Sequence, residues 1–345
     1  VKQSEYSFRC YGEIGPIDIP VLDISMYRPE CQNRLVNKEL AQYFYLTPYD
    51  ERDTFCWRVA LIKCTESKHI LCFCAEHLIF DGYSREIFEN EFKKFYQAKK
   101  NHMAVKAKKR ESFFSYNEKV KQQTEDKMKD ADYLKKEDFF QEGGQAKGLP
   151  TQGEISIYQH TISLDALIEN HPEKEQAELI SEVSYKLFLH VMAKLDGSRK
   201  IPFLTISEGR KLGEYSCFDC VGEFIDYVPY IGDVEEEDDY QEYLQYLKKI
   251  ESDGIRITDI FELSGEKVKF QGYLSNMKAV YNYQNYRIVK RQEWIKKSEE
   301  KIVNLKGLLN YIVRPKESAL EIILVYNKMI PDFQELLEST FAEII

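Results

Sequence analysis

The chain has 345 residues, of which 43% are hydrophobic and 31% are charged, and its formal net charge is -10. This length favours two lobes over one ordinary core, and the composition predicts a folded, soluble protein. The acidic balance argues against a nucleic-acid binder, whose contact surface would be basic. No apolar run reaches the length of a membrane span, and the start has no signal-peptide core, so we expect a cytoplasmic protein. The first residue, Val1, is not Met, which indicates a fragment of a longer chain.

The first half of the chain predicts an extended segment, a hairpin and then helices. Residues 17–25 are extended in pattern, and residues 38–46 are a short helical candidate. Alternation over 55–64 and the apolar run 68–75 predict two strands joined by a tight turn. Ser84 is a plausible N-cap, and aromatic residues then recur at helical spacing (Phe88, Phe92, Phe95 and Tyr96). A charged helix is expected over 113–141, and the glycine-rich stretch that follows marks a lobe boundary near residue 150.

The second half alternates strands and helices. Strands are predicted over 154–162, 201–206, 278–283 and 319–326. An amphipathic helix lies between the first two of these strands and ends at Gly197, with one apolar face (Ile180, Val183, Leu187, Val191 and Leu195). Helices are also expected over 243–250 and after Pro331. The chain is therefore of the α/β class, with lobes at 1–150 and 151–345.

The eight cysteines do not form the spacing pattern of a secreted disulfide framework. In a chain of this length we expect reduced thiols in a cytosolic protein. Cys217-Phe218-Asp219-Cys220 is a lone C-x-x-C motif without a second pair of ligands at metal spacing and without a thioredoxin-like context. We interpret this motif as coincidental and expect no metal site.

The segment Glu76-His77-Leu78-Ile79-Phe80-Asp81-Gly82 carries the candidate chemistry, because it joins a predicted buried strand to a predicted helix. An imidazole at a strand exit can accept or steer a proton near neutral pH. A carboxylate at such an exit usually needs a cationic partner, and Arg210, also at a strand exit, is the candidate partner of Asp81. Gly82 is expected to permit a tight turn. An isolated histidine of this kind is more often an ordinary side chain, and no nucleophile elbow supports covalent catalysis.

The same segment resembles the His-His-x-x-x-Asp-Gly signature of condensation domains of nonribosomal peptide synthetases, which belong to the chloramphenicol-acetyltransferase-like superfamily. Further motifs follow in the order of that family. They are Tyr83-Ser84, Phe114-Ser115-Tyr116, Gly209-Arg210, Val221-Gly222-Glu223-Phe224-Ile225, Ile257 to Glu262, and Tyr281-Asn282-Tyr283-Gln284. The resemblance therefore runs nearly from end to end.

The resemblance implies two chloramphenicol-acetyltransferase-like lobes in a V, the first lobe incomplete, with a tunnel where they meet. It implies His77 as the catalytic residue, Asp81, Gly82 and Arg210 as structural active-site residues, and Glu76, Tyr83, Ser84 and Asn282 as tunnel-lining candidates. Its reaction is amide formation between a donor acyl or peptidyl thioester and an acceptor amine. Both substrates are carried on phosphopantetheine arms of carrier domains, so the implied partners are donor and acceptor carriers and adjacent synthetase domains. No cofactor bound to this chain, nucleic acid or membrane span is implied.

Two departures from the family pattern keep other functions open. Glu76 stands where the first His of the pair is usual, and Asp226-Tyr227 replace the family's Asn-Thr. A non-catalytic domain of the same fold that recruits a partner protein is one alternative. A stand-alone acyltransferase that uses a small soluble thioester is the other, and the Tyr281–Gln284 segment favours the synthetase family over it.

Overall fold

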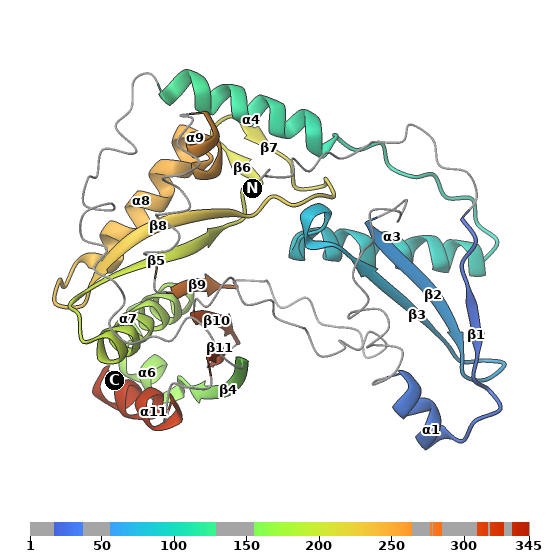
Figure 1. Cartoon of the computed structure of the whole chain (residues 1–345), viewed down its shortest axis with the longest axis horizontal. Helices are drawn as coiled ribbons and strands as arrows, with labels where there is room; N and C mark the ends of the chain where they lie inside the picture. The colour runs from blue at the N-terminus through green and yellow to red at the C-terminus, as the bar shows by residue number, and fades with distance from the viewer. Residues whose placement is uncertain are drawn as a thin grey trace, which may run out of the picture. The chain divides into compact units, whose positions relative to one another are not determined.

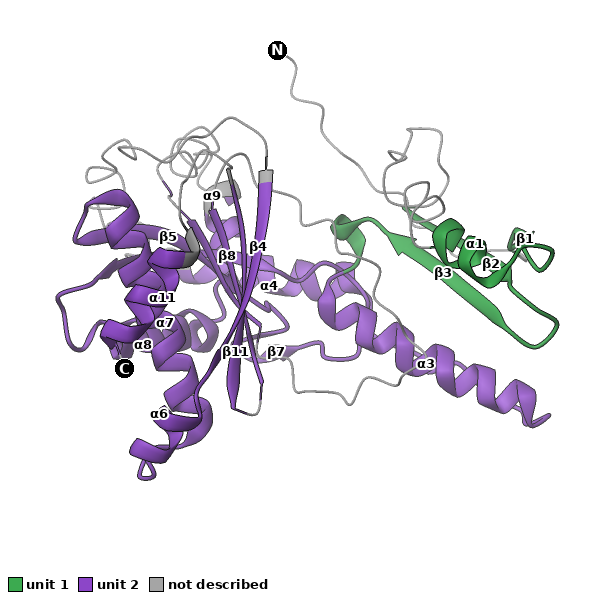
Figure 2. Cartoon of the chain, turned by 90° about the horizontal axis from the view of Figure 1, so that it is seen from below, with its two compact units in different colours: residues 1–80, 297–301 green, residues 81–296, 302–345 purple. Residues whose placement is uncertain are grey.

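The computed structural model describes residues 17–36, 56–128, 155–263, 277, 279–284, 309–316, 318–327 and 333–344. The chain divides into two compact units, which Figure 2 colours separately. Unit 1 comprises residues 1–80 and 297–301, and unit 2 comprises residues 81–296 and 302–345. The lobe boundary predicted near residue 150 and the helix predicted over 38–46 lie outside the described residues, and the arrangement of two lobes stays a prediction.

Unit 1 contains a three-stranded sheet in the order β1 (Val21–Asp23), β2 (Trp57–Lys63) and β3 (His69–Ala75). The β2–β3 hairpin is the one that the alternating sequence predicts, and its register pairs Trp57 with Ala75. β1 runs parallel to β2 and continues to α1 (Pro29–Arg34). A small core of buried residues (Ile24, Ile62 and Cys64) packs beneath this sheet. Unit 1 closes with a short 3-10 helix, η2 (His77–Ile79), directly after β3.

Unit 2 is built on a six-stranded sheet in the order β4-β11-β10-β9-β5-β8 (Figure 1). These strands are β4 (Ile155–Ser163), β5 (Lys200–Ser207), β8 (Asp226–Asp233), β9 (Ala279–Tyr283), β10 (Leu309–Pro315) and β11 (Ala319–Asn327). β9 is parallel to both of its neighbours, whereas the outer pairs are antiparallel. A small hairpin, β6 (Lys211–Leu212) and β7 (Tyr215–Ser216), follows β5.

Side chains of successive strand residues point to opposite faces, so the sheet supports two separate cores. Phe203 of β5 packs in the larger core against α7 (Gln176–Asp196), while the next residue, Leu204, packs in a second core with α9 (Ile257–Leu263). The larger core also receives α8 (Asp239–Asp253) and α11 (Phe333–Ile344), and the short α6 (Asp165–Asn170) follows β4. α7 ends at Gly197 in a left-handed conformation, as predicted.

Two long helices precede the six-stranded sheet in the chain and belong to unit 2. α3 (Gly82–Lys100) begins directly after the candidate motif, and α4 (Phe113–Met128) follows it. α4 packs on the loop after β5 through a third core, which contains Tyr116, Val120 and Phe224. Through this core α4 is attached to the segments that carry the Gly-Arg and Val-Gly-Glu-Phe motifs. The part of the predicted helix beyond Met128 lies outside the described residues.

Candidate functional site

The candidate histidine lies where the sequence predicts, directly after a strand. β3 ends at Ala75, and the backbone N–H of Glu76 donates to the carbonyl of Cys56, 2.9 Å away. His77 then begins η2 with an exposed side chain, and Glu76 is half-buried. Asp81 follows His77 by four positions in the sequence and is the first residue of unit 2.

Asp81 is buried and forms the N-cap of α3. Its Oδ1 accepts a hydrogen bond of 2.7 Å from the backbone N–H of Ser84, which satisfies one of the open donors of the first helical turn. The prediction that Ser84 is the N-cap is therefore wrong by three residues. Gly82 is the first residue of the helix and is not among the described glycines with positive φ, and the tight-turn role expected of it stays a prediction.

The predicted pair of Asp81 and Arg210 is present. One guanidinium nitrogen of Arg210 lies 2.6 Å and 2.8 Å from the two carboxylate oxygens of Asp81. The exposed fractions of the two side chains are 1% for Arg210 and 4% for Asp81, so water cannot replace either partner. The pair links residues 129 positions apart in the sequence.

Arg210 also organises the loop that follows it. Its second nitrogen donates to the carbonyl oxygens of Cys217 and Cys220, at 3.1 Å and 2.9 Å. The guanidinium lies over the rings of Tyr83 and Phe224, 4.6 Å and 4.0 Å from their centroids. Arginine suits this position because its planar group can donate in several directions and stack at the same time. The charge is thus compensated by one carboxylate, two carbonyls and two aromatic faces.

Ser84 closes the same network from α3. Its hydroxyl donates to the carbonyl of Gly222 and accepts from the backbone N–H of Gly222, both at 2.9 Å, and it also accepts from Arg210. The backbone N–H of Asp81 donates to the carbonyl of Gly222 as well. The side chain of Ser84 is fully buried, so the expectation that it lines a tunnel is replaced by a structural role.

Gly209 and Gly222 leave no room for a side chain, because a backbone carbonyl approaches the first and an aromatic ring approaches the second. Gly209 has φ +58°, and a Cβ added there would lie 2.0 Å from the carbonyl oxygen of Phe224. A Cβ on Gly222 would lie 2.3 Å from the ring of Phe113. The hydroxyl of Tyr116 donates to the carbonyl of Gly209, and burial raises the pKa of Tyr116 to about 12, which keeps the donor protonated. We call Asp81, Ser84, Arg210 and Gly222 the buried frame.

Asp226, one of the departures from the family pattern, has a structural explanation. Its carboxylate oxygens accept from the backbone N–H groups of Ile257 and Thr258, at 2.7 Å and 3.2 Å, and so satisfy the first turn of α9. Burial raises the pKa of Asp226, and these two hydrogen bonds and Arg256 oppose that rise. The residue therefore stabilises the fold beside the buried frame.

The remaining sequence-predicted residues have mixed outcomes. Tyr83 is half-buried beneath the guanidinium of Arg210. Asn282 lies in β9, half-buried, and pairs in register with Ile312 of β10. A tunnel-lining role stays a prediction for Glu76, Tyr83 and Asn282. Among the described residues no group of His, Cys, Asp or Glu side chains has the arrangement of a metal site, and none of the helices found there has both the length and the apolar character of a membrane crossing.

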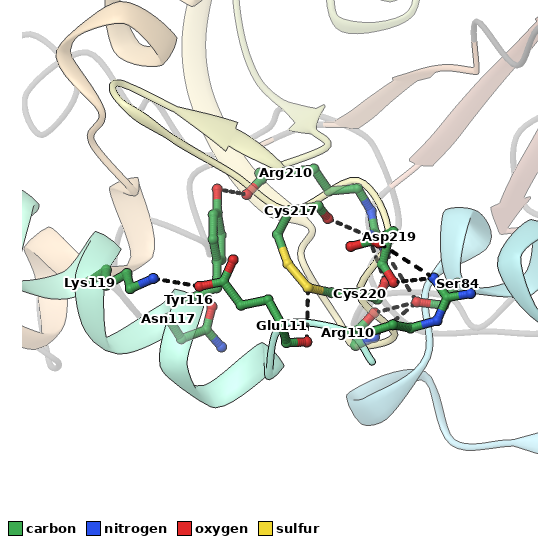
Figure 3. Close-up of a disulfide and its surroundings, with 12 residues drawn as sticks. Ser84, Arg110, Glu111, Tyr116, Asn117, Lys119, Arg210, Cys217, Asp219 and Cys220 are labelled. Carbon is green, nitrogen blue, oxygen red and sulfur yellow. Dashed lines mark hydrogen bonds and ion pairs between the residues drawn. A yellow bond between two sulfur atoms is a disulfide. The ribbon is translucent and has the colours of Figure 1, made fainter. Parts of the chain in front are cut away.

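The interpretation of Cys217-Phe218-Asp219-Cys220 as coincidental is wrong, because the structure joins these two cysteines by a disulfide (Figure 3). The C-x-x-C spacing was the sequence signal that could have predicted this bond. Sequence reasoning also missed the roles of Tyr116 and Gly222, since Tyr116 donates to the carbonyl of Gly209 and Gly222 pairs with Ser84, and both contacts join segments far apart in the sequence.

Comparisons with known proteins give one consistent result. A family model described as the condensation domain matches residues 3–328. An 84-residue stretch is 36% identical to a cyclosporin synthetase of Tolypocladium inflatum, and an 87-residue stretch is 31% identical to a nonribosomal peptide synthetase of Curvularia clavata. These stretches cover 24% and 25% of this chain, which spans no more than about 1% of the length of either relative.

Solved structures resemble the fold over most of its length. The X-domain from teicoplanin biosynthesis matches with a TM-score of 0.66 and 13% identity, over 96% of this chain and 77% of that chain. The first condensation domain of the calcium-dependent antibiotic synthetase matches with a TM-score of 0.60 and 15% identity, over 95% of this chain and 77% of that chain. These likenesses confirm the predicted α/β fold class.

Proposed function

This chain belongs to the condensation-domain family, and we propose that it forms an amide bond between two carrier-bound substrates. The donor is an acyl or peptidyl thioester on one carrier, and the acceptor is an amine on a second carrier. Phosphopantetheine arms deliver both groups, so the chain needs no cofactor of its own. The tethers raise the effective concentration of the amine at the thioester, so a single well-placed proton acceptor is sufficient chemistry.

His77 is the proposed catalytic residue. The amine nitrogen attacks the thioester carbonyl, the C–N bond forms, and the C–S bond breaks to release the donor thiolate. The proton lost by the amine passes to the imidazole and then to the departing thiolate, so the step is balanced without a further reactant. Neutral imidazole is suited to this transfer because its pKa is ordinarily about 6.5.

The observation that carries the proposal is the buried frame immediately after His77. Asp81, Ser84 and Arg210 are each less than 5% exposed, and together they tie the first turn of α3 to the loop after β5. A catalytic side chain must be held close to its productive position by neighbours that are themselves fixed. The frame begins at Asp81, four positions after His77 in the sequence. Glu76, by contrast, is half-buried, and its backbone donates to the carbonyl of Cys56 and accepts from the N–H of Ile79.

The test is a single-turnover assay with the 345-residue chain, a loaded donor carrier and a loaded acceptor carrier. Mass spectrometry of the acceptor arm detects the amide. His77→Ala is expected to lower the rate by about 10²–10⁴-fold, the usual contribution of a positioned acid–base group. His69→Ala is the matched control, because His69 is also exposed and lies at the opposite end of β3. Equal rates for His77→Ala and wild type would refute the chemical role of the imidazole.

A second candidate is a non-catalytic domain that recruits a partner protein, and the specific observation that favours it is Glu76 in place of a histidine. This candidate requires that the folded chain gives no amide with several donor–acceptor pairs, and that partner binding is indifferent to His77→Ala. A parallel assay with soluble pantetheine thioesters in place of the loaded carriers distinguishes carrier-dependent condensation from a stand-alone acyltransferase. Turnover that needs no carrier would overturn the proposal.

A further inference from the structure

The disulfide Cys217–Cys220 lies within the loop that Arg210 organises. The two Cα atoms are 5.6 Å apart, a usual spacing for bonded cysteines, and both side chains are buried. The loop lies outside the helices and strands, and its neighbours Phe218 and Val221 are 46% and 43% exposed. The sulfur atoms are therefore covered by a short surface loop, and opening that loop is enough to expose them.

The main-chain carbonyls of this loop are the acceptors that hold two arginines. Arg210 donates to the carbonyls of Cys217 and Cys220, and Arg110 donates to the carbonyl of Asp219 at 2.6 Å. The backbone N–H of Cys217 donates in return to the carbonyl of Arg210 at 2.8 Å. The covalent bond between the cysteines fixes where these carbonyls point. The oxidation state of the pair is thereby coupled to the position of the Arg210 guanidinium.

The fold also provides a partner for the reduced state. The Sγ of Cys220 lies 3.2 Å from the carbonyl oxygen of Glu111, as Figure 3 shows. A disulfide sulfur carries no hydrogen, whereas a Cys220 thiol can donate to this carbonyl. The guanidinium groups of Arg110 and Arg210 are cationic neighbours of the loop, and such neighbours favour the thiolate that thiol–disulfide exchange requires. Both oxidation states thus find partners at the same place.

We propose that Cys217 and Cys220 form a redox-responsive pair, and that its oxidation state sets the rigidity of the buried frame. A dithiol reductant transfers two electrons and two protons. One of its thiolates attacks a sulfur of the pair, a mixed disulfide forms, and the second thiol closes the reductant disulfide and leaves two protein thiols. Reduction releases the loop, loosens the hold of Arg210 on Asp81 and frees the first turn of α3. Oxidation restores the rigid frame.

The expected effect of reduction on hydrogen exchange follows from the entropy of loop closure. Opening a ring of four residues restores conformational entropy that corresponds to about a 20-fold change in the opening equilibrium of the loop. The reporter amides are those that donate into the frame, namely Ser84 to Asp81 and Gly222 to Ser84. Their hydrogen exchange is expected to accelerate by up to this factor after reduction. Amides in the centre of α7 serve as internal references, because α7 packs in a different core.

The experiment compares hydrogen exchange of the full chain with and without dithiothreitol under native conditions, after mass analysis of alkylated thiols has established the oxidation state. Cys217→Ser with Cys220→Ser is expected to exchange like the reduced protein and to ignore the reductant. Cys31→Ser with Cys56→Ser, which changes two cysteines outside the disulfide, is expected to keep the full response. The wild-type comparison stands without the variants, should either fold poorly.

Three results would overturn the proposal. The first is two free thiols in protein purified without reductant and exposed to oxidised glutathione. The second is a disulfide that dithiothreitol reaches only after global unfolding, since that bond would be purely structural. The third is native reduction that leaves the exchange of the Ser84 and Gly222 amides unchanged. These readouts do not use condensation activity, so the inference and the proposed function fail independently.

Discussion

Replacing Arg210 by methionine tests whether the buried frame depends on one guanidinium. Methionine keeps an unbranched apolar stem that can still pack against Phe224 and Tyr83, so the cavity term is small. The change leaves the Asp81 carboxylate buried without its cation. It also removes the donor to the carbonyls of Cys217 and Cys220. The expected outcome is that Asp81 loses its compensating charge and that three further acceptors, the carbonyls of Cys217 and Cys220 and the hydroxyl of Ser84, lose their donor.

The contacts of Arg210 set the size of the expected loss of unfolding free energy. Removing one partner of a buried pair costs about 3–5 kcal/mol, and each orphaned buried carbonyl costs about 1–3 kcal/mol before relaxation. These costs share one network and do not add, so we expect a loss of about 3–5 kcal/mol for Arg210→Met. A domain has about 5–15 kcal/mol in total, so this loss is about a fifth or more of the stability of unit 2. Asp81→Asn is expected to cost less, because the amide oxygen can still accept from the N–H of Ser84.

Hydrogen exchange is the suitable assay, because a chain of two units need not unfold in one step. A loss of 3–5 kcal/mol corresponds to about 10²–10⁴-fold faster exchange of α3 amides that open with the frame. Arg199→Met is the matched control, since Arg199 pairs with Asp233 and Glu235 on the surface and is 49% exposed. Solvent-exposed ion pairs contribute little to the free energy of unfolding. A loss below about 1 kcal/mol for Arg210→Met, or strict additivity with Asp81→Asn, would refute the reasoning.

The local elements of the fold could be predicted because their signals are short-range. The β2–β3 hairpin follows from alternation and a tight turn, and α7 follows from its apolar stripe and Gly197. β8 and β10 escaped prediction, since Asp226-Tyr227-Val228-Pro229 and Arg314-Pro315 interrupt the apolar pattern. The strand order of the large sheet depends on pairing between distant segments, which no local pattern encodes.

The candidate site likewise has contacts that the sequence predicts and contacts that it does not. The partnership of Asp81 with Arg210 could be predicted because a buried carboxylate requires a cation and both residues stand at strand exits. The roles of Ser84 and Gly222 could not be predicted, since they depend on two backbones 138 residues apart meeting at hydrogen-bond distance. The C-x-x-C spacing was visible in the sequence, but only the conformation of the loop decides whether its sulfur atoms meet.

Two further substitutions test the frame and its surroundings. Gly209→Ala is expected to cost about 2–5 kcal/mol, because it adds a clash with the carbonyl of Phe224 to the left-handed backbone penalty, whereas Gly197→Ala, with open space around its Cβ, is expected to cost only about 1–2 kcal/mol. Equal losses of unfolding free energy in denaturant titrations would contradict the close approach at Gly209. Asp226→Asn removes a carboxyl whose pKa is raised by burial, while its amide oxygen can still accept from the N-terminus of α9. A raised pKa means that the folded state binds the proton more tightly, so the contribution of Asp226 to stability is full below about pH 4 and is lost as the pH rises through the folded pKa. The free energy of unfolding of Asp226→Asn relative to wild type is therefore expected to increase from pH 4 to pH 7. If this difference in unfolding free energy does not change over the range, the charge of Asp226 is fully compensated by the helix and Arg256, and the prediction is wrong.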